Sequence, residues 1–484
     1  MNRQKITHPE WALKHKRSGA ELRFISNHYY LYEVSSVYDK ELKRAKKITG
    51  PLLGKITQKD GFVPSKKKTV KAEIPVDQPV YCREFGLSRF MIDSANFIVE
   101  ALKDALPENW QTVLGLAYCR LGWQAPLKNA PFLVNESALK DLLPIEQFNE
   151  KNIRSTLTFL GKNRDLLKKY MHKFVQEGAH TLIDATEFFS KSRHISLTKK
   201  GYNKDMVFDD QISLLYLYST NDLMPTFYRL LAGNMREVKA MSLTIKESGV
   251  KNAIIIADKG FYSLANVKEL EDNNLNFIIP LKRDNKIIKY EPLAQIETKN
   301  TYFKYQNRYI YYLTIQIENN TCVLFFDGKL KEQEKTDYLN RIISLPEKFN
   351  HDNFLLKLNS FGTIALLTNL KNPNPEDLYT TYKNRANIEQ MFDSLKNVLA
   401  ADCSYMQDDA MLEGWMFINH IALQYYHILY KNLKNQNLLS NYSVSDILLY
   451  LKHIKQINID AQWRTTEVVS KITKVLSKLG VHIT

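Results

Sequence analysis

Two aspartates in the chain stand where an enzyme could use them for metal binding or catalysis. Asp184 follows the apolar pair Leu182-Ile183, and Asp258 follows the apolar run 253–257. We expect each aspartate at the end of a strand, and in open α/β sheets the carboxyl ends of strands border the ligand crevice. Gly260, just beyond Asp258, allows a ligand to approach closely. The competing interpretation is that each aspartate is a turn residue that ends its strand.

A third acid, Glu389, is expected on a helix beside residues that bind anions. At about 100° per residue, the side chains that share its face within an arc of about 60° are Tyr382, Arg385 and Lys396. The neighbouring face is apolar and consists of Ile388, Met391, Phe392, Leu395 and Leu399. One side of the helix would therefore pack on a sheet while the acid and its cations face a crevice. A salt-bridged surface helix is the competing interpretation.

The charge of the chain favours a polyanionic partner. Lys and Arg total 67 against 52 Asp and Glu, a net charge of +15 and a pI near 9.2. Nucleic acid is the first candidate, although surplus lysine also serves solubility. The 44% hydrophobic residues are ordinary for a folded protein. The length of 484 residues predicts roughly two to four packed units.

Several classes of function have no support in the sequence. The four cysteines are far apart and form no CxxC, which argues against a zinc knuckle or a disulfide framework and fits a reducing cytosol. The N-terminus is polar and the apolar run 416–430 contains polar residues, so we expect no signal peptide and no membrane span. A Walker loop, G-x-G-x-x-G and H-E-x-x-H are all missing, which leaves no case for ATP, dinucleotide or zinc chemistry.

The elements that would position these residues predict an α/β fold. Strands are expected at 181–184, 212–218, 252–258, 276–281 and 361–368, with a helix N-cap at Ser263 and a long helix from Pro375. A mixed-sheet catalytic core is interrupted by an antiparallel β insertion and flanked by helical N- and C-terminal regions. The predicted segments are a basic module and linker at 1–75, a helical and DNA-binding region at 76–170, the core at 171–284 and 359–400, the insertion at 285–358 and a helical region at 401–484.

Tyr382-x2-Arg385-x3-Glu389-x6-Lys396 resembles the Y-(2)-R-(3)-E-(6)-K signature of the DDE transposases of bacterial insertion sequences, in particular their IS-four-like group. Asp184-Ala-Thr, Asp258-Lys-Gly-Phe-Tyr, Gly233-Asn234 before a helix and the β insertion before the glutamate agree in order and context. The resemblance covers about residues 175–430 well and the two ends only loosely.

The resemblance implies an RNase H-like core in which Asp184, Asp258 and Glu389 are catalytic and bind two Mg²⁺ or Mn²⁺ ions. Hard cations favour carboxylate oxygens, and two of them about 4 Å apart stabilise the attacking and leaving oxygens of an in-line phosphoryl displacement. Tyr382, Arg385 and Lys396 would hold the DNA backbone near the scissile phosphate. The implied partners are double-stranded DNA, as transposon ends and target, and a second copy of the chain in the DNA complex. A cytoplasmic, nucleoid-associated location in a prokaryote would follow.

Some members of this family form hairpin ends and stack a flipped base on tryptophan in the insertion, but this chain has no tryptophan between 285 and 358. Aromatic residues could stack instead, although we expect most of them to form the insertion core: Tyr302, Tyr305, Tyr309, Tyr311, Tyr312, Phe325 and Phe326. The hairpin route stays open.

Three other functions compete with transposition. A structure-selective DNA nuclease would use the same metals without strand transfer. A DNA-binding regulator would need no catalytic site, yet all three carboxylates are present. A phosphatase of the aspartyl-phosphate class would need a second aspartate where Thr186 stands.

Overall fold

The computed structural model describes residues 8–39, 44–65, 80–143, 148–200, 210–235, 237–459 and 461–482. The chain divides into two compact units, Met1–Pro79 and Val80–Thr484. Residues 1–7, 40–43 and 66–75 of the predicted basic module lie outside the described residues. The finer domain boundaries that the sequence suggests stay predictions.

The described part of the first unit is an antiparallel sheet with one short helix, α1 (Glu10–Leu13). The strands pair in chain order: β1 (Ala20–Ile25), β2 (His28–Asp39), β3 (Arg44–Thr57) and β4 (Gly61–Pro64). Ser26 and Asn27 join β1 to β2 with φ of 49° and 62°, the left-handed backbone that a type I′ hairpin turn requires. The small core of this unit consists of Ala12, Ala20, Leu22, Leu31 and Ile56.

The second unit contains one mixed sheet. Its central strands are β9 (Met224–Ala232), β8 (Asp210–Ser219), β6 (His180–Ser190), β10 (Ile254–Ile256) and β11 (Asn276–Leu281), side by side in that order. β6, β10 and β11 are parallel, whereas β8 runs antiparallel to both β6 and β9. The short strand β7 (Lys199–Lys200) also pairs with β8, and β16 (Cys403–Ser404) pairs with β6. The predicted mixed α/β fold class is confirmed.

The segment that the sequence predicts as an insertion extends this sheet. β15 (Thr363–Thr368) pairs with β11, and beyond it lie β14 (Asn320–Asp327), β13 (Arg308–Ile317) and β12 (Tyr302–Tyr305), all antiparallel. The rest of the segment predicted as β is helical, in η6 (Glu291–Thr298), α10 (Gly328–Ser344) and α11 (His351–Lys357). α10 forms because Asp327 caps it, accepting a hydrogen bond from the backbone N–H of Leu330, and because residues 329–335 are all good helix formers, namely Lys, Leu, Glu and Gln.

The aromatic residues of the insertion are divided between core and surface. Phe325 and Phe326 are buried, as expected, but Tyr302 and Tyr309 are 48% and 60% exposed. Phe303, Tyr305 and Phe325 surround the ring of Tyr379 on α12 (Pro375–Lys383), with centroid distances of 5.6, 5.2 and 5.0 Å. These contacts fix the insertion to the helix that leads into Arg385 and Glu389.

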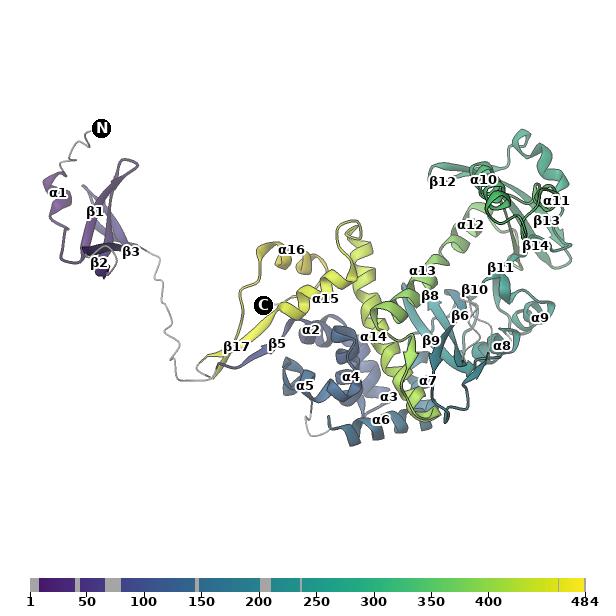
Figure 1. Ribbon diagram of the computed structural model, residues 1–484, viewed down its shortest axis with the longest axis horizontal. Helices are drawn as coiled ribbons and strands as arrows, with labels where there is room; N and C mark the ends of the chain where they lie inside the picture. The colour runs from purple at the N-terminus through teal and green to yellow at the C-terminus, as the bar shows by residue number, and fades with distance from the viewer. Residues whose placement is uncertain are drawn as a thin grey trace. The chain divides into compact units, whose positions relative to one another are not determined.

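Helices from both ends of the second unit pack together around α14 (Asp409–Asn435) (Figure 1). The N-terminal ones are α2 (Gly86–Arg89), η1 (Phe90–Ser94), α3 (Asn96–Ala105), α4 (Trp110–Trp123), η2 (Leu127–Asn129), α5 (Ala130–Asn135), η3 (Ala138–Asp141), α6 (Glu150–Lys162) and α7 (Arg164–His172). α6 crosses α14 closely at two glycines: a Cβ on Gly161 would lie 1.9 Å from the carbonyl oxygen of Ala410, and one on Gly414 2.3 Å from that of Leu157.

The C-terminal region predicted as helical also contains strands. α15 (Val444–His453) and α16 (Ser470–Lys478) are helices, but β17 (Lys455–Ile459) pairs with β18 (Gln462–Thr465) and with β5 (Cys82–Glu84). Residues far apart in the chain thus form a three-stranded sheet, which local sequence patterns do not reveal.

The central sheet is covered on both faces. Tyr216 and Tyr228 point toward α14, where both rings lie near His420. Arg229, which follows Tyr228 and so points to the other face, pairs with Glu247 on α8 (Glu237–Ser248) at 2.5 Å. Burial on both faces explains why β8 and β10 are continuous apolar runs.

Candidate active site

The pairing of β10 with β6 brings the two aspartates together. The strands are parallel and in register through Ile256 and Leu182, so the next side chains on the same face belong to Asp258 and Asp184. Asp258 lies just beyond β10, and its carboxylate accepts the backbone N–H of Lys259 at 2.7 Å. Asp184 is in the middle of β6, so the expectation that it ends a strand was wrong. β6 continues because residues 185–189 pair with β8 and its last two residues pair with β16.

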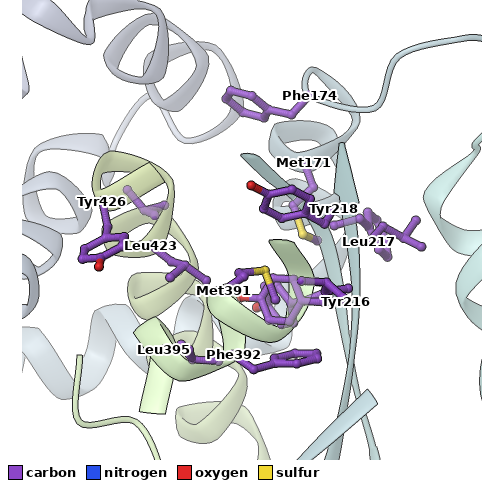
Figure 2. Packing of buried hydrophobic residues seen from close by; sticks show 14 of the residues in the cluster. Met171, Phe174, Tyr216, Leu217, Tyr218, Met391, Phe392, Leu395, Leu423 and Tyr426 are labelled. Carbon is purple, nitrogen blue, oxygen red and sulfur yellow. The ribbon is translucent and has the colours of Figure 1, made fainter. Parts of the chain in front are cut away.

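Helix α13 (Ala386–Asp393) carries Glu389 and is held by its apolar face. Ile388, Met391 and Phe392 are buried, and the ring of Phe392 lies 6.1 Å from that of Tyr216 on β8. Figure 2 shows Met391 and Phe392 beside Tyr216. Glu389 is on the more exposed side, with 53% of its side chain accessible.

Arg385, one turn before Glu389, contacts all three acids. Its Nη1 is 3.3 Å from Oδ1 of Asp258 and 3.6 Å from Oδ2 of Asp184, and its Nη2 donates to Oε1 of Glu389. Burial is the largest single effect and lowers the pKa of Arg385, but Asp258, Asp184, Tyr382 and Glu389 together raise it more, so the pKa stands above its ordinary value. The contact of one guanidinium, that of Arg385, with carboxylates from three distant segments is the most distinctive feature of this site.

The donor set fits divalent cations, although the described side-chain arrangement is not yet a metal site. Three carboxylates are the hard oxygen ligands that Mg²⁺ and Mn²⁺ prefer, and here they already surround one cation. Within the described ranges, however, no group of three or more His, Cys, Asp or Glu is arranged to hold a metal ion. The physical reason is that the guanidinium of Arg385 lies between the acids. It would have to withdraw before the three carboxylates could share an ion.

Tyr382 and Lys396 lie on either side of this segment, but not on one regular helix as predicted. α12 ends at Lys383, and the backbone N–H of Arg385 binds the carbonyl of Tyr382, three residues back, at 3.0 Å. Lys396 is half-buried on the π-helical turn η7 (Ser394–Val398). Both irregular turns change the rotation per residue, so the four residues do not share one regular helix, although Tyr382 still lies near Arg385 and the acids. Burial raises the pKa of Tyr382, which keeps its hydroxyl protonated and able to donate.

Arg120, which no local pattern in the sequence singles out, anchors the far end of the Glu389 segment. This buried side chain of α4 donates Nε to Oδ1 of Asn419 at 2.9 Å, and Nη2 donates to the carbonyl of Leu399 and, at 3.3 Å, to that of Ala400. Leu399 and Ala400 follow η7 directly. A cation at a helix C-terminus is favourable, because the last carbonyls there have no partner within the helix. Arg120 therefore fixes where the helix carrying Glu389 ends.

A family model and a solved structure are similar to this chain. The family model described as "Transposase DDE domain" matches residues 176–424, which include all three acids. A cryo-EM structure titled as a piggyBac transposase synaptic complex with hairpin DNA is similar at 13% identity and a TM-score of 0.40, over 76% of this chain and 78% of that one. No curated protein has a significantly similar sequence. In the described part of the chain, no helix is long and apolar enough to cross a membrane.

The chain belongs to the DDE-domain transposase family. Proteins of this family are enzymes that cut and join DNA strands, generally with divalent metal ions.

Proposed function

We propose that the protein binds the terminal repeats of an insertion sequence and catalyses their cleavage and transfer to target DNA. The main support is that Asp184, Asp258 and Glu389, which come from three distant segments, all contact the guanidinium of Arg385. The strand order β9-β8-β6-β10-β11 supports an RNase H-like core. In this order β9, β8 and β6 are antiparallel to one another in turn, and β10 and β11 run parallel to β6. The IS-four-like assignment rests on the Tyr382, Arg385, Glu389 and Lys396 spacing.

In this proposal Asp184, Asp258 and Glu389 hold two Mg²⁺ or Mn²⁺ ions. When bound, such ions stabilise the charge that develops on the attacking and leaving oxygens of a phosphodiester. Asp184 is on β6 and Asp258 caps η5 (Lys259–Phe261) just beyond β10, whereas Glu389 is on α13, which lies between α12, where Tyr379 packs on the β strands, and η7, where Arg120 holds the carbonyls that follow. The backbone segments that carry the acids are thus positioned before substrate binds, which limits the reorganisation that the reaction requires.

The other residues of the signature bind the DNA backbone. Arg385 exchanges the three carboxylates for a phosphate, which a guanidinium can hold through two parallel hydrogen bonds. The protonated hydroxyl of Tyr382 donates to a phosphate oxygen, and Lys396 contributes a point charge. Water displaces the 3′ oxygen of the transposon end, and the 3′-hydroxyl so formed then displaces an oxygen in a target phosphodiester. We further propose that two copies act on paired ends, in the nucleoid of a prokaryotic cell.

The test compares Glu389→Gln with wild type on DNA that carries the repeats flanking the gene. We expect cleavage and joining in Mg²⁺ or Mn²⁺ to be abolished while DNA binding persists, because the substitution removes one ligand charge and leaves the basic surface intact. Glu376→Gln, an equal charge change at an exposed position of α12, is the control and should keep full activity. Unchanged nicking by Glu389→Gln would refute the assignment. Cleavage by wild type without joining would indicate a nuclease on the same core.

A further inference from the structure

A cleft of about 530 Å³ opens beside the acids. Its walls include Lys259, Lys282, Arg283, Glu334, Thr363 and Tyr382. Tyr382 connects the cleft to the candidate active site, because the same side chain interacts electrostatically with Asp258, Glu389 and Asp184. Lys259 directly follows Asp258, and Lys282 directly follows β11. Both therefore lie at the carboxyl ends of neighbouring parallel strands, where α/β sheets bind their ligands.

The cations of the cleft are not equivalent. Arg283 is engaged in the fold: its Nη2 donates to Oε1 of Glu334 at 2.9 Å and to the carbonyl of Thr363 at 3.1 Å. Glu334 in turn accepts the backbone N–H of Gly362 at 2.7 Å. Arg283 and Glu334 thus form a neutral wall that joins the core to the insertion helix α10.

Lys259 and Lys282 supply the excess charge. Both are exposed, and among the residues that the structure describes neither has a carboxylate within ion-pairing distance. Two flexible lysines leave a net charge of about +2 on the rim of an open cleft next to three acids that bind cations. An exposed ammonium group is suited to a phosphate oxygen rather than to a base edge, since it acts as a point charge without fixed geometry.

We propose that this cleft binds the phosphate backbone of the DNA strand that adjoins the scissile phosphate, with Lys259 and Lys282 each neutralising one phosphodiester. The inference deepens the proposed function and rests on it, because it assumes that the reacting phosphate lies at the three acids. Because Tyr382 lines the cleft and also lies near the acids, a ligand that extends from the acids into the cleft, such as a DNA strand, is favoured. A separate small anion would not need this continuity. Contacts of this kind position the strand without reading its sequence.

The experiment uses the full-length chain and a fluorescently labelled DNA duplex of mixed sequence. Binding of the variant Lys259→Gln/Lys282→Gln is measured by anisotropy over a range of salt concentrations, in EDTA and again in Ca²⁺. The slope of log K against log [salt] should become shallower by about 1.8, since each phosphate contact contributes about 0.9. The control is Lys251→Gln/Lys268→Gln, the same charge change at exposed lysines just before β10 and on α9 (Leu264–Asp272). The control should keep the wild-type slope.

A second measurement locates the contact directly. Lysine acetylation followed by mass spectrometry should show that the duplex protects Lys259 and Lys282 but not Lys251 and Lys268. A wild-type slope in Lys259→Gln/Lys282→Gln, equal slopes for variant and control, or no protection of the two lysines would each overturn the inference. Absence of DNA binding by wild type would overturn it too. If only the proposed function is wrong, the result is different. Wild type would then bind DNA through the two lysines but would not cut it in Mg²⁺ or Mn²⁺.

Discussion

Arg385 is expected to compete with metal ions for the three acids, and Arg385→Gln tests this competition. In wild type without metal, the guanidinium balances the negative charges of Asp184, Asp258 and Glu389. A metal ion can be shared by these acids only after the guanidinium leaves. The variant removes that competitor, so metal-free protein should lose stability while its affinity for metal rises.

The magnitude follows from the geometry. At 3.3 Å, a pair of unit charges in an effective dielectric of about 20 attracts by about 5 kcal/mol before desolvation is counted. Removing one partner of a buried pair costs about 3–5 kcal/mol. Because the side chain of Asp258 is 33% exposed and that of Glu389 is 53% exposed, we take the lower limit, about 3 kcal/mol. A coupling of about 1–3 kcal/mol corresponds to metal binding that is about 5–150-fold tighter.

Mn²⁺ binding to EDTA-treated protein, followed by the EPR signal of free Mn²⁺, measures the affinity, and thermal unfolding with and without Mn²⁺ measures the stability. Arg385→Lys distinguishes competition for the carboxylates from charge repulsion between residue 385 and the metal ion. The lysine keeps the positive charge but cannot bridge three acids, so this variant should bind Mn²⁺ more tightly than wild type does. Arg154→Gln, at an exposed position of α6, is the control. Competition between Arg385 and the metal is excluded if Arg385→Gln binds Mn²⁺ no more tightly than wild type, or loses the same stability with and without Mn²⁺.

Three further predictions concern the support of the site. Arg120→Lys should lower kcat of cleavage about 10–100-fold with KM for DNA unchanged, because one ammonium cannot hold both Asn419 and the carbonyls after η7; kcat is referred to the folded fraction measured by thermal unfolding, since misfolding also lowers apparent kcat, and a wild-type kcat per folded molecule would contradict this role. The pKa of Glu247 is lowered: burial raises it, but Arg164 and Arg229 lower it more. Its stabilising contribution is therefore present above the unfolded-state pKa and lost as pH falls through the folded-state pKa, and thermal unfolding of Glu247→Gln should depend less on acid pH than that of wild type. Gly414→Ala should destabilise the protein by about 1–3 kcal/mol, because the new Cβ would clash with the carbonyl of Leu157; Gly328→Ala, where a Cβ meets its nearest atom at 3.9 Å, should unfold at or slightly above the wild-type temperature.

The sequence predicts those parts of the fold whose signals are local. The apolar runs of β8 and β15 mark strands because both faces are buried, and Pro375 marks the first turn of α12, where a missing N–H does no harm. Ser263 caps α9 as predicted, accepting a hydrogen bond from the backbone N–H of Asn266. The spacing of Arg385 and Glu389 correctly places both on one side of a helical turn.

Features that depend on distant partners could not be predicted in this way. β6 continues past Asp184 because β8 and β16 are there to pair with it, and β16 comes from beyond residue 400. Arg120 lies 279 residues from Leu399, and neither residue has a local pattern that points to the other. The helix α10 is a different case, since Asp327 and the Lys- and Glu-rich run after it were visible signals that the aromatic strands before them obscured.

The antiparallel pairing of β11 with β15 has a consequence for how this protein could change over evolution. The chain leaves the core at Leu281 and returns at Thr363, and Leu281 lies opposite Ala365 in the sheet. The two ends of the intervening segment are therefore adjacent, so a tight turn could join them without threading the chain. Such a segment can grow, shrink or be exchanged, provided that the ring of Tyr379 keeps packing partners in place of Phe303, Tyr305 and Phe325. Its removal would convert β15 from an interior strand into an open edge, and that edge would have to be protected from pairing with other chains.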